Sequence, residues 1–367
     1  MSVLAPLLES SLGRLRHDRR VTPLRDLRRQ VAAMPVAPRF EAALRYAPRL
    51  AVIAEVKRSS PSTGDFATHI AGSEGVADLA RRYADAGAAA ISVLTEPTRF
   101  GGSDDDLRAA TRAGIPVLRK DFTVDAYQVW QARALGAGAV LLLARVLDDA
   151  QLAACLDAAA QAGIDAMIEV HDAAELERAL SADATLIGVN ARDLDTLEVD
   201  RGRALELIAS ARGTGATLVA ESGMSTPQDL AAAADAGAHA ALIGTALLSA
   251  DDPAATLDGL VATPQRTVIP MPAHPRRTMI KTCGLRDEAG VRAAVAADAD
   301  LAGFVVAANS RRQVAAADAG RLATGLVTIP PVLVFRAADA GEVADARRAF
   351  GPISPGIQLA GFDTPPA

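Results

Sequence analysis

The sequence predicts an α/β protein built on a (β/α)8 TIM barrel, and three observations carry that prediction. Eight short apolar runs alternate with segments of helical periodicity. The runs are too apolar to leave one face in water, which indicates a parallel sheet covered by helices. Most helical segments stop at a glycine just before the next run, where a left-handed C-cap is favoured. The predicted strands are Ala51–Val56, Ala88–Leu94, Ile115–Arg119, Ala139–Leu143, Asp165–Val170, Thr185–Asn190, Thr217–Ala220 and Ala240–Ile243.

An open, doubly wound sheet would give a similar alternation of strands and helices. In its dinucleotide-binding form, that architecture carries a G-x-G-x-x-G turn after its first strand, followed by an acidic residue for the ribose. The first run here leads instead into Arg58-Ser59-Ser60-Pro61, and no such turn follows it. The barrel is therefore favoured.

In chain order, residues 1–50 are predicted to form a helical extension and residues 51–262 the barrel. The extension holds helices near Val3–Arg19 and Pro23–Met34 and a short segment near Phe40–Arg45. Residues 263–277 are rich in Pro and Arg, which is typical of a linker. Residues 278–367 then form a C-terminal half-barrel-like βα segment. The barrel helices are predicted at Gly75–Ala86, Ala126–Leu135, Asp148–Ala162, Asp172–Leu180, Arg201–Ala211 and Thr226–Ala236, with helix-ending glycines at Gly87, Gly114, Gly136, Gly163, Gly215 and Gly237.

Composition excludes several classes of function. The formal net charge of -6 gives no electrostatic case for binding nucleic acid or an anionic membrane. No apolar run approaches the ~18 residues that a transmembrane helix needs, and the N-terminus lacks the apolar core of a signal peptide. The two cysteines, Cys155 and Cys283, fit a reducing compartment. We expect a cytoplasmic protein, monomeric or weakly oligomeric, that acts on a small molecule.

Lysine usage points to chemistry at the ends of strands. The chain has 38 Lys and Arg residues, but only three of them are lysines: Lys57, Lys120 and Lys281. Each lysine closes an apolar run, in AVIAEVK, IPVLRK and MIK. Burial can tune a lysine ammonium to act as an acid, a base or a nucleophile, whereas an arginine keeps its proton.

Other polar residues also follow the predicted strands at their carboxyl ends, where barrel enzymes assemble their active sites. Glu55 and Lys57 are two residues apart on a strand and so share one face. The last two strands end in glycines next to Ser or Thr, in SGM and IGTALL, and the loops after strands seven and eight of a barrel commonly bind phosphate. The strand-end residues are Glu55, Lys57, Thr95, Glu96, Lys120, Asp121, Arg145, Glu169, Asn190, Arg192, Glu221, Ser222, Gly223, Gly244 and Thr245.

Seven segments, in order and spacing, closely resemble the indole-3-glycerol phosphate synthase family of tryptophan biosynthesis. They are IAEVKRSSPS, ISVLTEPTRFGGS, VLRKDFTVDAYQV, MIEVHD, IGVNARDL, AESGM and LIGTALL. The resemblance covers residues from about 50 to 261. It implies a (β/α)8 barrel that closes, decarboxylates and dehydrates 1-(o-carboxyphenylamino)-1-deoxyribulose 5-phosphate, with no metal and no organic cofactor.

The resemblance also implies roles for individual residues. Lys120 matches the family's general acid, Glu169 its partner carboxylate and the base of the dehydration, and Lys57 a lysine that contacts the anionic groups of the substrate. Glu55 and Glu221 would orient these lysines. The assignment of each proton to one lysine stays open. The other implied contacts are Asn190 and Arg192 with the anthranilate carboxylate, Phe100 and Phe122 with its ring, Ser60 in the active-site turn, and Ser222, Gly223, Gly244 and Thr245 with the phosphate.

The C-terminal segment resembles the first half of phosphoribosylanthranilate isomerase. Cys283 would match the catalytic base of that family and Arg312 a substrate contact, but Ala360 stands where the family has a histidine. The second half of that barrel is missing, so we expect the segment to be inactive. Four parallel strands leave unpaired edges, which suggests a partner for this half barrel.

Three other functions remain open at this point. The chain could be a bifunctional synthase and isomerase. It could be an aldolase in which Lys120 attacks the carbonyl of a sugar phosphate to form a Schiff base. It could also be a phosphate-binding protein without activity, although such a protein would not need two lysines and three carboxylates in one cleft.

Overall fold

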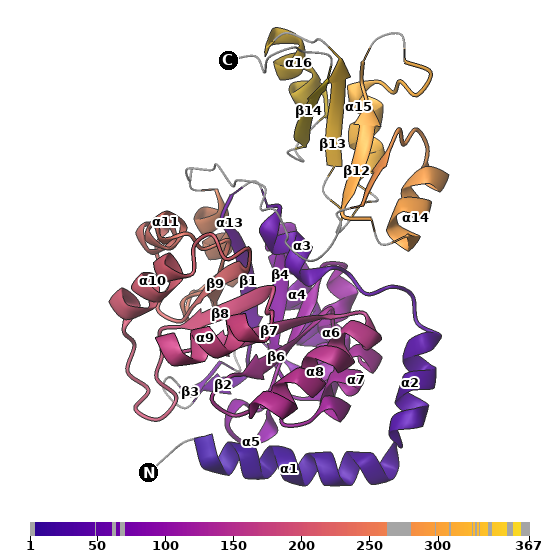
Figure 1. Ribbon diagram of the computed structural model, residues 1–367. Helices are drawn as coiled ribbons and strands as arrows, with labels where there is room; N and C mark the ends of the chain where they lie inside the picture. Colours follow the sequence, from indigo (N-terminus) through magenta and orange to yellow (C-terminus); the bar gives the residue numbers. More distant parts are fainter. Residues whose placement is uncertain are drawn as a thin grey trace. The chain divides into compact units, whose positions relative to one another are not determined.

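Eight parallel strands close into a barrel in the computed structural model of the chain (Figure 1). The order around the barrel is β1-β10-β9-β8-β7-β6-β5-β4, so each strand lies beside its neighbours in the sequence and β10 returns to β1. The predicted fold class is confirmed. The structure describes residues 4–47, 49–60, 64–66, 70–262, 280–297, 299–307, 310–324, 326, 329, 331–336, 340–350 and 355–360.

The barrel strands lie within one or two residues of the predicted runs. All are buried along almost their whole length, because helices cover the outside and apolar side chains fill the inside. The strands are β1 Ala51–Val56, β4 Ala90–Leu94, β5 Val117–Lys120, β6 Ala139–Leu143, β7 Asp165–Val170, β8 Leu186–Asn190, β9 Thr217–Glu221 and β10 Ala240–Ile243, and β2 Ser59–Ser60 pairs with β3 Gly64–Asp65 outside the barrel.

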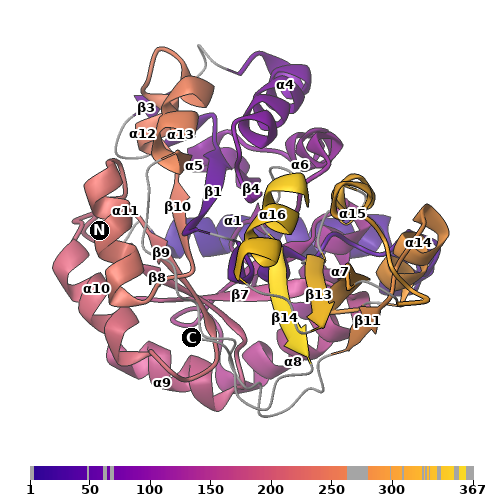
Figure 2. The same ribbon diagram turned by 90° about the horizontal axis from the view of Figure 1, so that it is seen from above.

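Helices surround the ring of strands (Figure 2). The six glycines predicted to end helices all have positive φ, from 71° at Gly163 to 110° at Gly237, as a left-handed cap requires. The helices that follow the barrel strands are α4 Gly72–Asp85, α5 Pro97–Phe100, α6 Asp104–Ala110, α7 Ala126–Ala134, α8 Asp149–Ala162, α9 Ala173–Ser181, α10 Arg201–Ser210, α11 Pro227–Ala236, α12 Thr245–Leu248 and α13 Pro253–Val261, with a 3-10 turn at Thr111–Ala113.

The N-terminal extension covers both ends of the barrel. It consists of α1 Leu4–Val21, α2 Leu24–Ala32 and α3 Phe40–Arg45, and α1 and α3 lie at opposite ends in Figure 1. Phe40 and Leu44 of α3 are fully buried in the apolar interior at the amino ends of the strands. Arg45 anchors α3 there by donating a hydrogen bond of 2.7 Å to Thr217 Oγ1. Helix α3 therefore closes this end of the barrel.

A second compact unit spans residues 273–367. Its four parallel strands are ordered β11-β12-β13-β14, and its core includes an edge-to-face contact between Phe304 and Phe350 with ring centroids 6.3 Å apart. The predicted linker, residues 263–277, lies outside the described residues. No helix in the described part of the chain is long and apolar enough to cross a membrane. The elements are β11 Lys281–Cys283, α14 Glu288–Ala296, β12 Leu301–Val305, α15 Ala316–Ala323, β13 Pro331–Arg336, α16 Ala340–Phe350 and β14 Gly356–Ala360.

Candidate active site

A cavity of about 460 Å³ lies at the carboxyl ends of the barrel strands. Every residue that the family resemblance assigns to the site lines this cavity, although the residues come from seven of the eight strands and the loops after them. The fourteen residues are Glu55, Lys57, Ser60, Phe100, Lys120, Phe122, Glu169, Asn190, Arg192, Glu221, Ser222, Gly223, Gly244 and Thr245.

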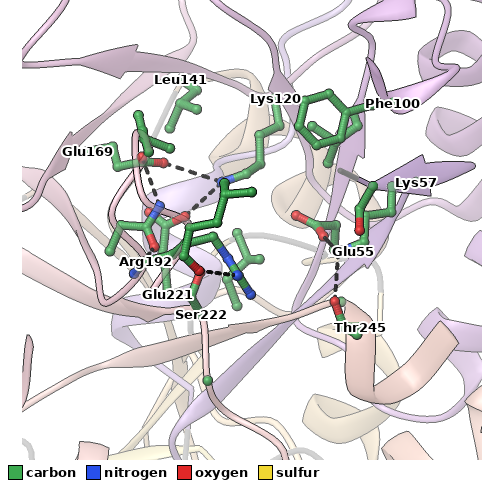
Figure 3. Close-up of a pocket in the computed structure, with 18 of the residues that line it drawn as sticks. Glu55, Lys57, Phe100, Lys120, Leu141, Glu169, Arg192, Glu221, Ser222 and Thr245 are labelled. Atoms are coloured by element: carbon green, nitrogen blue, oxygen red, sulfur yellow. Dashed lines mark hydrogen bonds and ion pairs between the residues drawn. The ribbon is translucent and has the colours of Figure 1, made fainter. Parts of the chain in front are cut away.

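Lys120 is the centre of one charged cluster in the cavity. Its ammonium Nζ is 2.9 Å from Glu221 Oε2 and 3.3 Å from Glu169 Oε2, and Figure 3 shows it directed at both carboxylates. The side chain of Lys120 is 15% exposed, while those of the two glutamates are almost completely buried. One cation thus holds together two carboxylates that would otherwise repel each other.

The electrostatics of this cluster follow from burial and from the shared ammonium. Burial lowers the pKa of Lys120, but Glu221, Glu169 and Glu55 outweigh it, so the pKa is raised and the lysine stays protonated. Burial raises the pKa of Glu169, yet Lys120 and His171 outweigh it, so its pKa is lowered. Burial and the neighbouring Glu169 raise the pKa of Glu221 to about 7, against the opposing effect of Lys120. Of the two carboxylates beside Lys120, Glu221 is therefore the one that is more easily protonated.

Glu55 and Lys57 form a second cluster, beside Thr245. Lys57 Nζ donates to Glu55 Oε1 at 2.8 Å and to Thr245 Oγ1 at 3.0 Å, and Figure 3 shows this group apart from the carboxylates of Glu169 and Glu221. Burial raises the pKa of Glu55, but Lys57 and Lys120 outweigh it and the net pKa is lowered. The cavity therefore carries an ammonium group on each side.

Asn190 supports Glu169. Its amide Nδ2 donates to Glu169 Oε1 at 3.0 Å, and its Oδ1 accepts from the backbone N–H of Arg192 at 2.9 Å. The guanidinium of Arg192 donates to the backbone oxygen of Leu197 at 2.9 Å. The predicted contact of these two residues with a substrate carboxylate stays a prediction.

The loop after β9 has an unusual backbone. Ser222 and Gly223 both have positive φ, 64° and 75°, and Ser222 is one of three residues other than glycine with positive φ in the described chain. Thr245 begins the short helix α12 directly after Gly244. These four residues follow the neighbouring strands β9 and β10 and line the cavity, and backbone N–H groups in such turns can bind an anion.

Two glycines leave room for the buried carboxylates. A Cβ atom at Gly188 would lie 2.0 Å from Glu221 Oε1, and a Cβ atom at Gly244 would lie 2.2 Å from Glu55 Oε1. Neither position can take a side chain unless a carboxylate of the site moves. Gly188 was not among the predicted site residues because its effect depends on the neighbouring strand.

We therefore expect Gly244→Ala to lower kcat/KM by about 10²-fold, because small displacements of reacting groups have costs of that size. The Glu55 carboxylate would have to leave its position beside Lys57. Gly259→Ala is the matched control, since a Cβ atom there meets nothing within 4 Å. Steady-state kinetics of the two variants give the comparison, and equal activities would contradict this account of Gly244.

The cavity has apolar walls that the sequence only partly indicated. Phe100 and Phe122 lie there as predicted, but Leu4 and Leu7 of α1 also line the cavity. Helix α1 is held over it by Arg14, whose guanidinium forms two hydrogen bonds with Asp121 at 2.9 and 2.7 Å. The amphipathic pattern of residues 3–19 predicted a helix, but not what its apolar face would cover. Further apolar lining residues are Leu94, Leu141, Leu143, Leu194, Leu197, Met224 and Leu242.

Three polar residues at strand ends do not reach the cavity. Glu96 turns back to accept hydrogen bonds from the backbone N–H groups of Thr98 and Arg99, and so caps α5. Thr95 is buried and donates to Asp121 Oδ2 at 2.6 Å. Arg145 lies beside Glu175, with a distance of 3.0 Å from Nε to Oε1. A position after a strand therefore does not by itself place a side chain in the site.

Comparison with known proteins assigns the barrel unit to a family. The family model described as indole-3-glycerol phosphate synthase matches residues 4–260. The chain is 47% identical over 257 residues to the indole-3-glycerol phosphate synthase of Parafrankia sp. (strain EAN1pec), covering 69% of this chain and 92% of the relative. It is 44% identical over 275 residues to that of Mycobacterium ulcerans (strain Agy99), covering 74% and 99%. The chain therefore belongs to the indole-3-glycerol phosphate synthase family.

Proposed function

We propose that this chain is a carboxy-lyase that converts 1-(o-carboxyphenylamino)-1-deoxyribulose 5-phosphate to indole-3-glycerol phosphate in the cytoplasm, as a step of tryptophan biosynthesis. The reaction forms one carbon–carbon bond and releases carbon dioxide and water. The observation that carries the proposal is the cavity itself. It holds two lysine–carboxylate clusters, and its apolar walls enclose enough space for an aromatic ring.

The first step is ring closure and needs an acid. The ring carbon that bears the carboxylate attacks the ketone, and Lys120 donates a proton to the carbonyl oxygen, which becomes a hydroxyl group. Loss of carbon dioxide then leaves its electron pair in the ring and restores aromaticity. Phe100, Phe122 and the leucines of the cavity would hold the ring, with Asn190 and Arg192 near its carboxylate.

The second step is dehydration and needs a base and an acid together. Glu169 takes a proton from the carbon next to nitrogen, and Lys57 donates a proton to the departing hydroxyl group, so that water leaves and the double bond of the indole forms. Glu55 and Glu221 orient and neutralise the two lysines. Ser222, Gly223, Gly244 and Thr245 bind the phosphate, and Ser60 belongs to the turn beside Lys57.

The ion pairs of Lys120 favour a proton donor over a nucleophile. A lysine that forms a Schiff base must be neutral when it attacks a carbonyl. Lys120 lies within 3.3 Å of two buried carboxylates, which stabilise its ammonium form. Borohydride should accordingly trap no covalent adduct between this lysine and a sugar phosphate.

For the C-terminal unit, we infer an origin in phosphoribosylanthranilate isomerase and no activity of its own. Its sheet has four strands in the described residues, half the number of a closed barrel. Cys283 is half-buried on β11, and Arg312 packs against Gly284. A complete isomerase site would also need residues from the strands and loops of the other half.

One experiment tests both assignments on the full-length protein. Indole fluorescence should develop with 1-(o-carboxyphenylamino)-1-deoxyribulose 5-phosphate, whereas phosphoribosylanthranilate in a parallel cuvette should remain unchanged. Cys283→Ser should leave the first rate as it is. Turnover of both substrates would show a bifunctional enzyme, and turnover of neither would contradict the synthase assignment and favour a binding protein.

A further inference from the structure

A buried histidine stands behind Glu169, and the steps above give it no role. His171 follows β7 two residues after Glu169 and is 2% exposed. Its ring nitrogen Nε2 lies 3.3 Å from Glu169 Oε1, and its Nδ1 lies 3.0 Å from Glu175 Oε2 on α9. The imidazole therefore bridges a carboxylate of the cavity and a carboxylate outside it.

Glu175 fixes the orientation of the imidazole. Its Oε2 also accepts a hydrogen bond of 2.8 Å from the backbone N–H of His171, and its Oε1 accepts one of 3.0 Å from Arg145 Nε. An ionised carboxylate can only accept, so the ring must carry a proton on Nδ1. The guanidinium of Arg145 favours the ionised form of Glu175, and Nε2 is left 3.3 Å from Glu169 Oε1.

The charges around Glu169 favour a proton on Nε2 as well. Nε2 is buried, lies 3.3 Å from Glu169 Oε1 and has no hydrogen-bond partner among the described residues, so a proton there interacts with the carboxylate through its charge. Burial lowers the pKa of His171, but Glu169 and Glu175 outweigh it and raise the pKa to about 9. Three other charged groups lie near Glu169. The ammonium of Lys120 attracts its Oε2, and the carboxylates of Glu221 and Glu55 are the negative groups close to it.

We propose that His171 is a positioning residue for the dehydration step, whose imidazolium, oriented by Glu175 and Arg145, holds Glu169 ionised and directed at the substrate. The Asn190 amide holds Glu169 Oε1 by a hydrogen bond, the imidazolium adds an opposite charge 3.3 Å from the same oxygen, and Oε2 is left toward Lys120. This inference rests on the proposed function, because it assumes that Glu169 acts as the base. A base that is already ionised keeps the enzyme active at lower pH.

The test is the pH profile of kcat/KM for His171→Gln in the full-length protein. Glutamine keeps a hydrogen-bond donor but removes the charge. The carboxylate of Glu169 then loses an adjacent cation, its pKa rises, and the acid limb should move to higher pH by about one unit or more. KM should change little, because His171 does not line the cavity. Glu175→Gln should move the acid limb in the same direction, by less.

His239→Gln is the matched control. His239 is a half-buried histidine before β10 whose Nδ1 accepts from the backbone N–H of Leu218, and it contacts no carboxylate of the site. The acid limb of the kcat/KM profile of His239→Gln should overlay that of the unmodified protein. Ionisations of the substrate affect every variant equally, so they do not contribute to differences between the profiles.

The outcomes separate this inference from the proposed function. His171 would be only a packing residue if His171→Gln and Glu175→Gln lowered kcat/KM equally at every pH. In that case the acid limbs of their pH profiles would overlay that of the unmodified protein. If His171→Gln does not fold, Glu175→Gln decides alone, because it changes one oxygen to nitrogen outside the cavity. No turnover by the unmodified protein would instead contradict the synthase assignment.

Discussion

Lys120→Arg should lower kcat/KM for indole formation by about 10³-fold, within the range that a positioned general acid contributes. Arginine keeps the positive charge that Glu169 and Glu221 require, so the buried carboxylates remain compensated. Its guanidinium cannot give up a proton at accessible pH, so the carbonyl oxygen loses its proton donor. The measurement is steady-state fluorescence of the product, with the thermal midpoint followed in parallel.

Lys120→Met complements Lys120→Arg, because arginine keeps the positive charge, whereas methionine removes both the charge and the proton donor. It removes the ammonium that neutralises the two glutamates, and Glu221, with its pKa already raised to about 7, would take up a proton to relieve the repulsion. We expect activity as low as in Lys120→Arg but a lower thermal midpoint. Lys281→Met is the control, since it removes a lysine from the second unit and should leave synthase turnover unchanged. Substantial activity in Lys120→Arg would contradict the role of Lys120 as acid.

The architecture of the barrel could be predicted from sequence because local signals coincide. The apolar runs set the strands, and glycines such as Gly163 and Gly237 end the helices, so strand ends could be located to within a residue or two. Barrel geometry then brings those ends together, which is why Glu55 and Glu221 could be expected in one site.

Features that depend on tertiary packing could not be predicted in this way. Glu96 and Glu169 both lie at the carboxyl ends of apolar runs, yet Glu96 caps a helix because the chain turns at once into α5. Leu7 lines the cavity because tertiary contacts, such as that of Arg14 with Asp121, hold α1 over it. His171 stands in a motif that the resemblance includes, but the orientation of its imidazole depends on Glu175. That residue lies on a helix whose orientation no local pattern specifies.

Glu169→Gln should separate decarboxylation from indole formation. The amide has nearly the same shape as the carboxylate but cannot accept the proton that dehydration releases. Ring closure and decarboxylation depend on Lys120 and should still proceed, so the first turnover should release carbon dioxide in an amount equal to the enzyme. Indole formation should fall by about 10²- to 10⁴-fold, as expected for loss of a general base. Single-turnover measurements with carboxyl-labelled substrate follow both products.

Glu96→Gln is the matched control for this prediction. Glu96 is also fully buried at the end of a barrel strand, but it points away from the cavity and accepts hydrogen bonds from two backbone N–H groups. Its amide variant should lower stability and leave the ratio of the two products at unity. If carbon dioxide and indole fall together in Glu169→Gln, the carboxylate acts before decarboxylation, and the base of the dehydration must be sought in Glu55 or Glu221, which lie in the same cavity.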